Sequence, residues 1–95
     1  MTSYENQARV FKILSVDTRI RMLELLKGGP LCVNALSKRL GITPSAVSQN
    51  LRILRDADLV VADKQGYFVH YGINRQTMMA LRSLADELFN MPSLL

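Results

Sequence analysis

The sequence predicts a mainly α-helical domain of the α+β type, in which four helices are followed by one β-hairpin and a last helix. Two observations carry this prediction. Apolar residues recur every three or four positions through most of the chain, which is the period of an amphipathic helix. Between residues 59 and 73 the pattern changes to β-branched and aromatic residues on both sides of a Lys-Gln-Gly segment, which is the composition of a hairpin.

Composition and charge fit a single globular domain with a polyanionic partner. The chain has 95 residues, of which 48% are hydrophobic and 21% are charged, so it can bury one modest core and is not a disordered segment. Residues 1–95 are therefore assigned to one domain. The formal net charge of +4 indicates either nucleic acid or an anionic membrane surface as the partner.

Neither a membrane span nor a secretion signal is predicted. No apolar run approaches the roughly 20 residues of a membrane span, and the N-terminus shows no apolar core or cleavage pattern of a signal peptide. One cysteine excludes an intrachain disulfide framework and suits a reducing compartment. We therefore expect a cytoplasmic protein without a membrane partner.

The first two helices are predicted over residues 4–15 and 18–27. Tyr4 and Phe11 belong to a sparse apolar stripe on the first helix, and this stripe needs a partner surface. Asp17 is placed as the N-cap of the second helix, because a short carboxylate there accepts hydrogen bonds from free backbone N–H groups. The predicted core positions of the second helix are Ile20, Leu23 and Leu26.

A helix-turn-helix is predicted over residues 31–57. Leu31-Cys32-Val33 is either a short strand or the start of the third helix. Gly41 tolerates the left-handed conformation of a tight turn. Thr43 is a good N-cap for the fourth helix, and Pro44 suits its first position because no helical hydrogen bond is lost there. Two short helices joined by such a glycine-containing turn have the arrangement of a helix-turn-helix.

A hairpin follows directly, over residues 59–73, with its turn placed at Lys64-Gln65-Gly66. Asn74 is a good N-cap for the last helix, residues 75–89, whose long apolar stripe also needs a partner. A helix-turn-helix followed by a hairpin is a winged helix, in which the hairpin forms the wing. This combination indicates a particular fold much more specifically than any one of its elements does.

One face of the fourth helix carries polar side chains at three-one-three spacing. They are Ser45, Ser48, Gln49 and Arg52. Hydroxyl, amide and guanidinium groups pair with base edges and phosphates. A solvated helix face is the ordinary explanation of such a pattern, and for an isolated helix it is the better one. The turn before this helix and the hairpin after it favour a DNA-binding face.

Four segments, taken together, resemble a known family. They are FKILSVDTRIRMLELL, LCVNAL, LGITPSAVSQNLRILRDADLV and YFVHYGI. These segments are similar to those of the ArsR/SmtB family of bacterial repressors, and the similarity extends from about Val10 to Phe89. The resemblance implies a homodimeric winged helix-turn-helix repressor that dimerises through its first and last helices and binds a pseudo-palindromic operator in double-stranded DNA.

The resemblance also implies two functional surfaces. Base edges would meet Thr43, Ser45, Ser48 and Gln49, with Asn50 as a secondary candidate, and the DNA backbone or minor groove would meet Arg52, Lys64, Gln65 and Tyr67. The dimer interface would contain Tyr4, Phe11, Met78, Leu81, Leu84 and Leu88. Gln49 is the best candidate for base recognition, because an amide can make a bidentate contact with adenine.

The chain departs from the metal-sensing patterns of this family. Where some relatives carry Cys-x-Cys, this chain has Cys32-Val33-Asn34, and its last helix offers Asp86 and Glu87 but no histidine. A lone thiolate is a poor site for a soft metal. We therefore expect no metal and no other cofactor, and a release signal that is not a metal and that the sequence does not identify. An oxidant at Cys32, an organic ligand and a protein partner are the alternatives. A redox switch normally needs a second thiol, and a small buried hydrophobe is the commoner role of a lone cysteine.

Two other functions compete with repression by DNA binding. A winged helix can become a protein-interaction module without DNA binding, but the polar face of the fourth helix carries no acidic residue, which favours DNA. An enzyme is not expected, because the sequence shows no nucleophile–base pair, no carboxylate pair with a plausible pocket and no glycine-rich phosphate loop.

Overall fold

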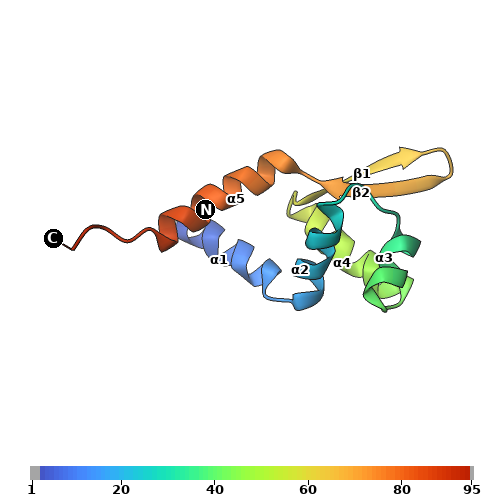
Figure 1. Cartoon of the computed structure of the whole chain (residues 1–95), viewed down its shortest axis with the longest axis horizontal. Helices are drawn as coiled ribbons and strands as arrows, with labels where there is room; N and C mark the ends of the chain where they lie inside the picture. The colour runs from blue at the N-terminus through green and yellow to red at the C-terminus, as the bar shows by residue number, and fades with distance from the viewer. Residues whose placement is uncertain (1–2, 95) are drawn as a thin grey trace.

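The computed structural model describes residues 3–94, with Ser3 described by its backbone only, so the ends of the predicted domain lie outside it. The elements follow the predicted order: α1 (Ser3–Leu14), α2 (Asp17–Leu26), α3 (Val33–Leu40), α4 (Pro44–Asp56), β1 (Val60–Gln65), β2 (Phe68–Ile73) and α5 (Arg75–Phe89). In Figure 1, α2, α3 and α4 form a central group. The β1–β2 hairpin extends from this group on one side, and α1 and α5 lie together on the other.

The molecule is elongated along the line that joins these two projections. Its principal extents are 57 × 26 × 24 Å and its radius of gyration is 15.2 Å, whereas a compact domain of 100 residues has about 13 Å. The hairpin, the α1–α5 pair and the extended C-terminal segment 90–94 all project from the central helices along this line (Figure 1). Among the described residues, no helix is both long enough and apolar enough to cross a membrane.

The core lies between the three central helices and the start of the hairpin. Its buried residues are Met22, Leu23, Leu26, Leu36, Leu40, Val47, Leu51, Leu54, Leu59 and Val60. The prediction of Ile20 as a core position is wrong, since its side chain is 48% exposed. A three-residue spacing drifts around a helix of 3.6 residues per turn. The buried face centred on Leu26 therefore includes Met22, four residues before it, and not Ile20.

The start of α2 differs from the prediction by one residue. Val16 occupies the N-cap position, with φ −101° and ψ 118°, and makes no side-chain cap hydrogen bond. Asp17 is the first residue of the helix and not its N-cap. A carboxylate in the first turn still interacts favourably with the positive end of the helix dipole. The residue type thus marked the helix start, but its capping role was assigned wrongly.

The hairpin turn lies further along the chain than predicted. The sequence predicts Lys64 and Gln65 in the turn, but both pair within the sheet, where Gln65 stands opposite Phe68. The turn residues are Gly66 and Tyr67, and Gly66 has the positive φ, +64°, that such a two-residue turn requires.

The segment before α3 is both a bridge and a helix start. The Leu31 N–H donates to the Tyr71 carbonyl at 3.0 Å, and the Tyr71 N–H donates to the Leu31 carbonyl at 2.8 Å. This isolated antiparallel bridge fixes the base of the hairpin beside the start of the helix-turn-helix. Cys32 then takes the N-cap position, and Val33 begins α3.

A Schellman motif ends α4 and leads directly into the hairpin. Asp58 takes a left-handed conformation with φ +63°. The N–H of Asp58 donates to the Arg55 carbonyl at 2.9 Å, and the N–H of Leu59 donates to the Leu54 carbonyl at 2.9 Å. Leu54 and Leu59 are both buried. The motif therefore fixes the direction in which the wing leaves α4.

Asp58→Gly should raise the free energy of unfolding by about 0.5–1 kcal/mol, because glycine adopts the left-handed conformation without a Cβ penalty. Asp56→Gly is the matched control. It places glycine in the last turn of α4 and should lower the free energy of unfolding by up to about 1 kcal/mol. Urea denaturation measures both changes, and equal destabilisation by the two variants would contradict the assigned motif.

Candidate nucleic-acid interface

Hydrogen bonds inside the turn hold the helix-turn-helix in shape. Gly41 has φ 68° and ψ 32°, which is the left-handed conformation expected of it. The Ser37 hydroxyl donates to the Ile42 carbonyl at 2.6 Å, and the Ser37 carbonyl accepts from the Gly41 N–H at 2.9 Å. Thr43 is the N-cap of α4, as predicted, and its Oγ1 accepts from the Ala46 N–H at 3.1 Å. These contacts set the angle at which α4 leaves the turn.

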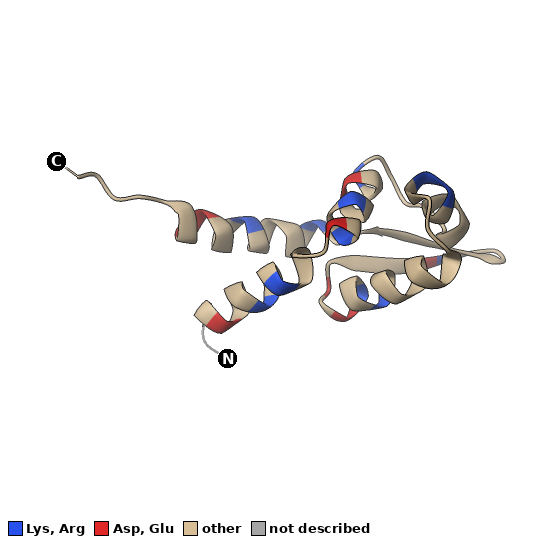
Figure 2. Cartoon of the chain, turned by 90° about the horizontal axis from the view of Figure 1, so that it is seen from below, with Lys and Arg blue, Asp and Glu red and all other residues tan. Residues whose placement is uncertain are grey.

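The predicted polar side chains of α4 lie on its exposed face. Exposed residues of this set are Thr43, Ser45, Ser48, Gln49 and Arg52, while Val47, Leu51 and Leu54 face the core. Residues 41–55 include no aspartate or glutamate, and the charged residues of the whole chain are mapped in Figure 2. We call the side chains of Ser45, Ser48, Gln49 and Arg52 the α4 polar face. It offers hydrogen-bond donors and acceptors and one cation without a repelling anion among them.

Asn50 differs from its neighbours because its side chain has partners inside the protein. Its Nδ2 donates to the Ala46 carbonyl at 2.9 Å, and its Oδ1 accepts from Arg19 Nε at 3.1 Å. Arg19 Nη1 also donates to the Ile13 carbonyl at 3.1 Å. Arg19, in α2, therefore connects the end of α1 with α4. This geometry favours a positioning role for Asn50, which the sequence offered only as a secondary DNA contact.

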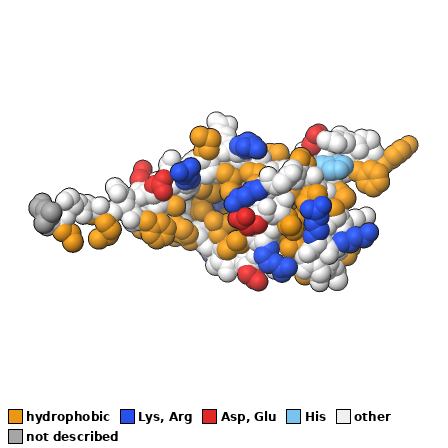
Figure 3. All heavy atoms as spheres, in the orientation of Figure 1, with side chains coloured by type: hydrophobic (Ala, Val, Ile, Leu, Met, Phe, Trp, Pro, Cys, Tyr) orange, Lys and Arg blue, Asp and Glu red, His pale blue; other side chains and the backbone are white. Residues whose placement is uncertain are grey.

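The tip of the wing is aromatic. The Tyr67 side chain is 100% exposed and that of Phe68 is 60% exposed. Figure 3 shows hydrophobic side chains at the far end of the hairpin. Lys64 and Gln65 are exposed on β1, and Gln65 Nε2 donates to Asp63 Oδ2 at 3.2 Å. Phe68 was not among the predicted site residues. The alternation of side chains along a strand does not indicate that the hairpin tip projects beyond the helices and exposes both of its faces.

The terminal helices form the second exposed surface. No residue of α5 is buried within the chain. The Phe11 and Phe89 rings meet edge to face with centroids 6.2 Å apart, and Gln7 Nε2 donates to the Leu84 carbonyl at 3.1 Å. The two apolar stripes, predicted to lack partners, thus contact each other. They still leave large apolar side chains in solvent, with Tyr4 81% and Leu88 51% exposed.

Metal-ligating residues do not gather within residues 3–94. No three histidine, cysteine, aspartate or glutamate side chains of this part of the chain lie close enough to hold a metal ion. Cys32 is a free, half-buried cysteine at the N-cap position of α3. His70 is half-buried in β2, and its covered Nδ1 has no hydrogen-bond partner among the described residues.

Comparison with known proteins agrees with this arrangement. Residues 17–61 match the family model described as bacterial regulatory protein, arsR family. The transcriptional repressor SdpR of Bacillus subtilis is 34% identical over 65 residues, which cover 68% of this chain and 72% of SdpR. The chain belongs to the ArsR family.

Two further ArsR-type similarities extend over more of the chain. The arsenical resistance operon repressor of Escherichia coli is 34% identical over 80 residues, covering 83% of this chain and 68% of that protein. A homodimeric winged helix-turn-helix DNA-binding domain from Mycobacterium bovis, solved by NMR, has a TM-score of 0.71 at 28% identity, covering 95% of this chain and 87% of that chain. The predicted family and fold are confirmed, and this ArsR-family protein is a DNA-binding transcriptional regulator.

Asn50→Ala should lower the free energy of unfolding by about 1–2 kcal/mol, because it leaves the part-buried Arg19 guanidinium without one of its acceptors. Binding to every duplex should weaken by a similar factor, since α4 loses its support. The neighbouring Gln49→Ala is the control and should change stability by less than about 0.5 kcal/mol. Thermal denaturation and binding to specific and scrambled duplexes measure the two effects. A changed base preference at unchanged stability would show that Asn50 contacts a base instead.

Proposed function

We propose that this ArsR-family protein is a homodimeric repressor that inserts α4 into the major groove of a pseudo-palindromic operator. The observation that carries the proposal is the α4 polar face, which is exposed, free of acidic residues and held at a fixed angle by the capped turn and by Asn50. The net charge of +4 per chain suits a polyanion, and dimerisation doubles it.

The exposed side chains of α4 and the wing divide into groups with different roles in this complex. Gln49 makes the main base contact, because its amide can pair with both groups of an adenine edge. Ser45, Ser48 and Thr43 hydrogen-bond to bases or phosphates with weaker discrimination. Arg52 and Lys64 bind phosphates and make affinity depend on salt. Gln65, Tyr67 and Phe68 approach the backbone or the minor groove, where proteins commonly insert apolar side chains.

A second copy of the chain covers the terminal helices. The interface residues are Tyr4, Phe11, Met78, Leu81, Leu84 and Leu88. The support is that α5 buries no residue within its own chain, that α1 covers only part of its apolar stripe, and that the related M. bovis domain is homodimeric. Two-fold symmetry then places the two α4 helices in successive major grooves, roughly one helical turn (~34 Å) apart.

The release signal is not a metal. The arrangement that supports this is the scatter of the acidic, histidine and cysteine side chains over residues 3–94. Oxidation of Cys32 remains one candidate signal, and its half-buried position gives it limited access to oxidants. Zinc, copper(I) and arsenite are to be titrated into the protein–operator complex. Stoichiometric binding of any of them with release of DNA would overturn this part of the proposal.

Gln49→Ala and Lys64→Ala should separate base recognition from phosphate binding. Gln49→Ala should cost about 1–3 kcal/mol at the operator and relax sequence preference. Lys64→Ala should weaken all sequences alike and reduce the slope of log K against log salt by about one. Fluorescence anisotropy at several salt concentrations measures both. Unchanged operator affinity in both variants would contradict the assigned docking of α4 and the wing on DNA.

Leu88→Glu should shift the protein towards the monomer and weaken operator binding, because a charge would be buried at the dimer interface without a partner. Ile20→Glu is the matched control, since Ile20 is also exposed but lies on α2, outside the apolar stripes of α1 and α5. Sedimentation velocity across a concentration series measures the oligomeric state. A dimer that survives Leu88→Glu unchanged would contradict the assigned interface.

A further inference from the structure

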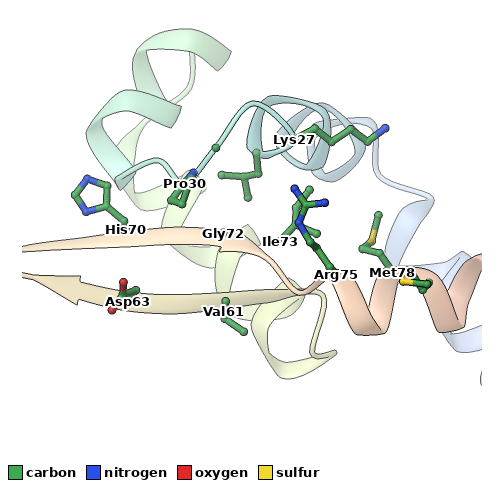
Figure 4. A pocket seen from close by; sticks show the side chains of 12 residues that line it. Lys27, Pro30, Val61, Asp63, His70, Gly72, Ile73, Arg75 and Met78 are labelled. Carbon is green, nitrogen blue, oxygen red and sulfur yellow. The ribbon is translucent and has the colours of Figure 1, made fainter.

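A cavity of about 660 Å³ lies where the wing meets the start of α5. One wall is the hairpin face that carries Val61 and Gly72, a second is Pro30 after α2, and a third is Met78 in α5. Figure 4 shows these elements around the cavity. Its volume falls in the range of small-molecule sites, which are concave, mainly apolar and supplied with a few polar groups.

Charged side chains stand at opposite ends of this cavity. In Figure 4, Lys27 and Arg75 lie towards the α2–α5 end, and Asp63 and His70 lie towards the wing. Lys27 is already paired with Glu24, at 2.6 Å, and Asp63 accepts a hydrogen bond from Gln65. The Arg75 guanidinium forms no ion pair with any other described residue.

The exposed Arg75 side chain stands where a bound anion would be favoured. Arg75 is the first residue of α5, and the positive end of a helix dipole repels a cation there. A carboxylate bound at this point would meet both the guanidinium, in a bidentate geometry, and the positive helix end. Asp63 at the other end would repel a second negative charge.

We propose that this cavity binds a small organic monocarboxylate with an apolar body, and that its binding changes affinity for DNA. The carboxylate pairs with Arg75, and the apolar body packs against Pro30, Val61 and Ile73. The regulatory half of this inference rests on the proposed function, whereas the binding half does not.

Coupling follows from which elements form the cavity walls. The hairpin carries the DNA-facing wing, and α5 carries the proposed dimer surface. Only Asn74 separates β2 from α5, so a ligand held between them selects one angle of the wing relative to the dimer. A ligand shifts such an equilibrium only as far as its affinities for the two arrangements differ.

Binding is tested on the full chain by NMR titration with benzoate, phenylacetate and octanoate, each paired with its neutral carboxamide. At least one acid should bind saturably, shift the backbone signals of Val61, Gly72 and Arg75, and bind about tenfold tighter than its amide, as a charge-assisted contact to arginine predicts. No saturable shift with any acid, or shifts confined to other parts of the chain, would overturn the proposal.

Two variants with matched controls locate the contacts. Arg75→Gln should abolish the preference for acid over amide, and Arg21→Gln, at an exposed α2 position outside the cavity, should not. Gly72→Val should weaken acid and amide alike, because a Cβ at Gly72 lies 3.5 Å from Pro30 Cγ, an ordinary contact, and fills the cavity. Val69→Ile enlarges a β2 side chain outside the cavity and should leave binding unchanged. If Arg75→Gln and Gly72→Val both left the affinities for acid and amide unchanged, the site would be refuted.

Duplex affinity is measured with and without the acid that binds. A change of about fivefold or more that disappears in Gly72→Val supports coupling, and an unchanged duplex affinity overturns it. Failure of the ligand-free protein to bind any duplex would overturn the proposed function instead, and the NMR titration would still decide the carboxylate site.

Discussion

The small core made by α2, α3, α4 and the start of the wing is the constraint on which the other features depend. It is fully packed, with Met22, Leu36, Val47 and Leu54 each at 0% exposure. It reaches neither the tip of the hairpin nor the outer face of α5. The surfaces of the two ends differ. One presents hydrogen-bonding groups and a cation beside an aromatic tip, and the other presents exposed apolar side chains such as Tyr4, Leu88 and Phe89.

Much of this architecture was predictable because it depends on local chemistry. Thr43 and Asn74 cap their helices through their own side chains, and Gly41 and Gly66 supply positive φ at turns. Each of these features is decided within a few residues of the chain. These local features predicted the order of the helices, the hairpin and the exposed side chains of α4. The family resemblance predicted in addition that the first and last helices act together.

The features that escaped prediction depend on residues distant in sequence. Ile20 is exposed because the face of α2 that carries Met22, Leu23 and Leu26 is turned to the core, and the helices packed beside α2 decide which face that is. Asn50 is occupied because Arg19, 31 positions earlier, reaches its amide oxygen. Phe68 is exposed because the hairpin extends beyond the helices beneath it. The periodicity of one helix or strand does not indicate which other element packs against it. Contacts between distant elements could therefore be identified only in the structure.

The bridge between Leu31 and Tyr71 has a consequence for how such proteins diversify. Its two hydrogen bonds bring the beginning of the helix-turn-helix and the base of the wing side by side, so the intervening segment is a closed loop with adjacent ends. The same loop carries most of the core residues, and these pack against Met22, Leu23 and Leu26 of α2. A substitution inside the loop can therefore persist only where it still fits this face of α2, so α2 limits how far the helix-turn-helix and the wing can vary.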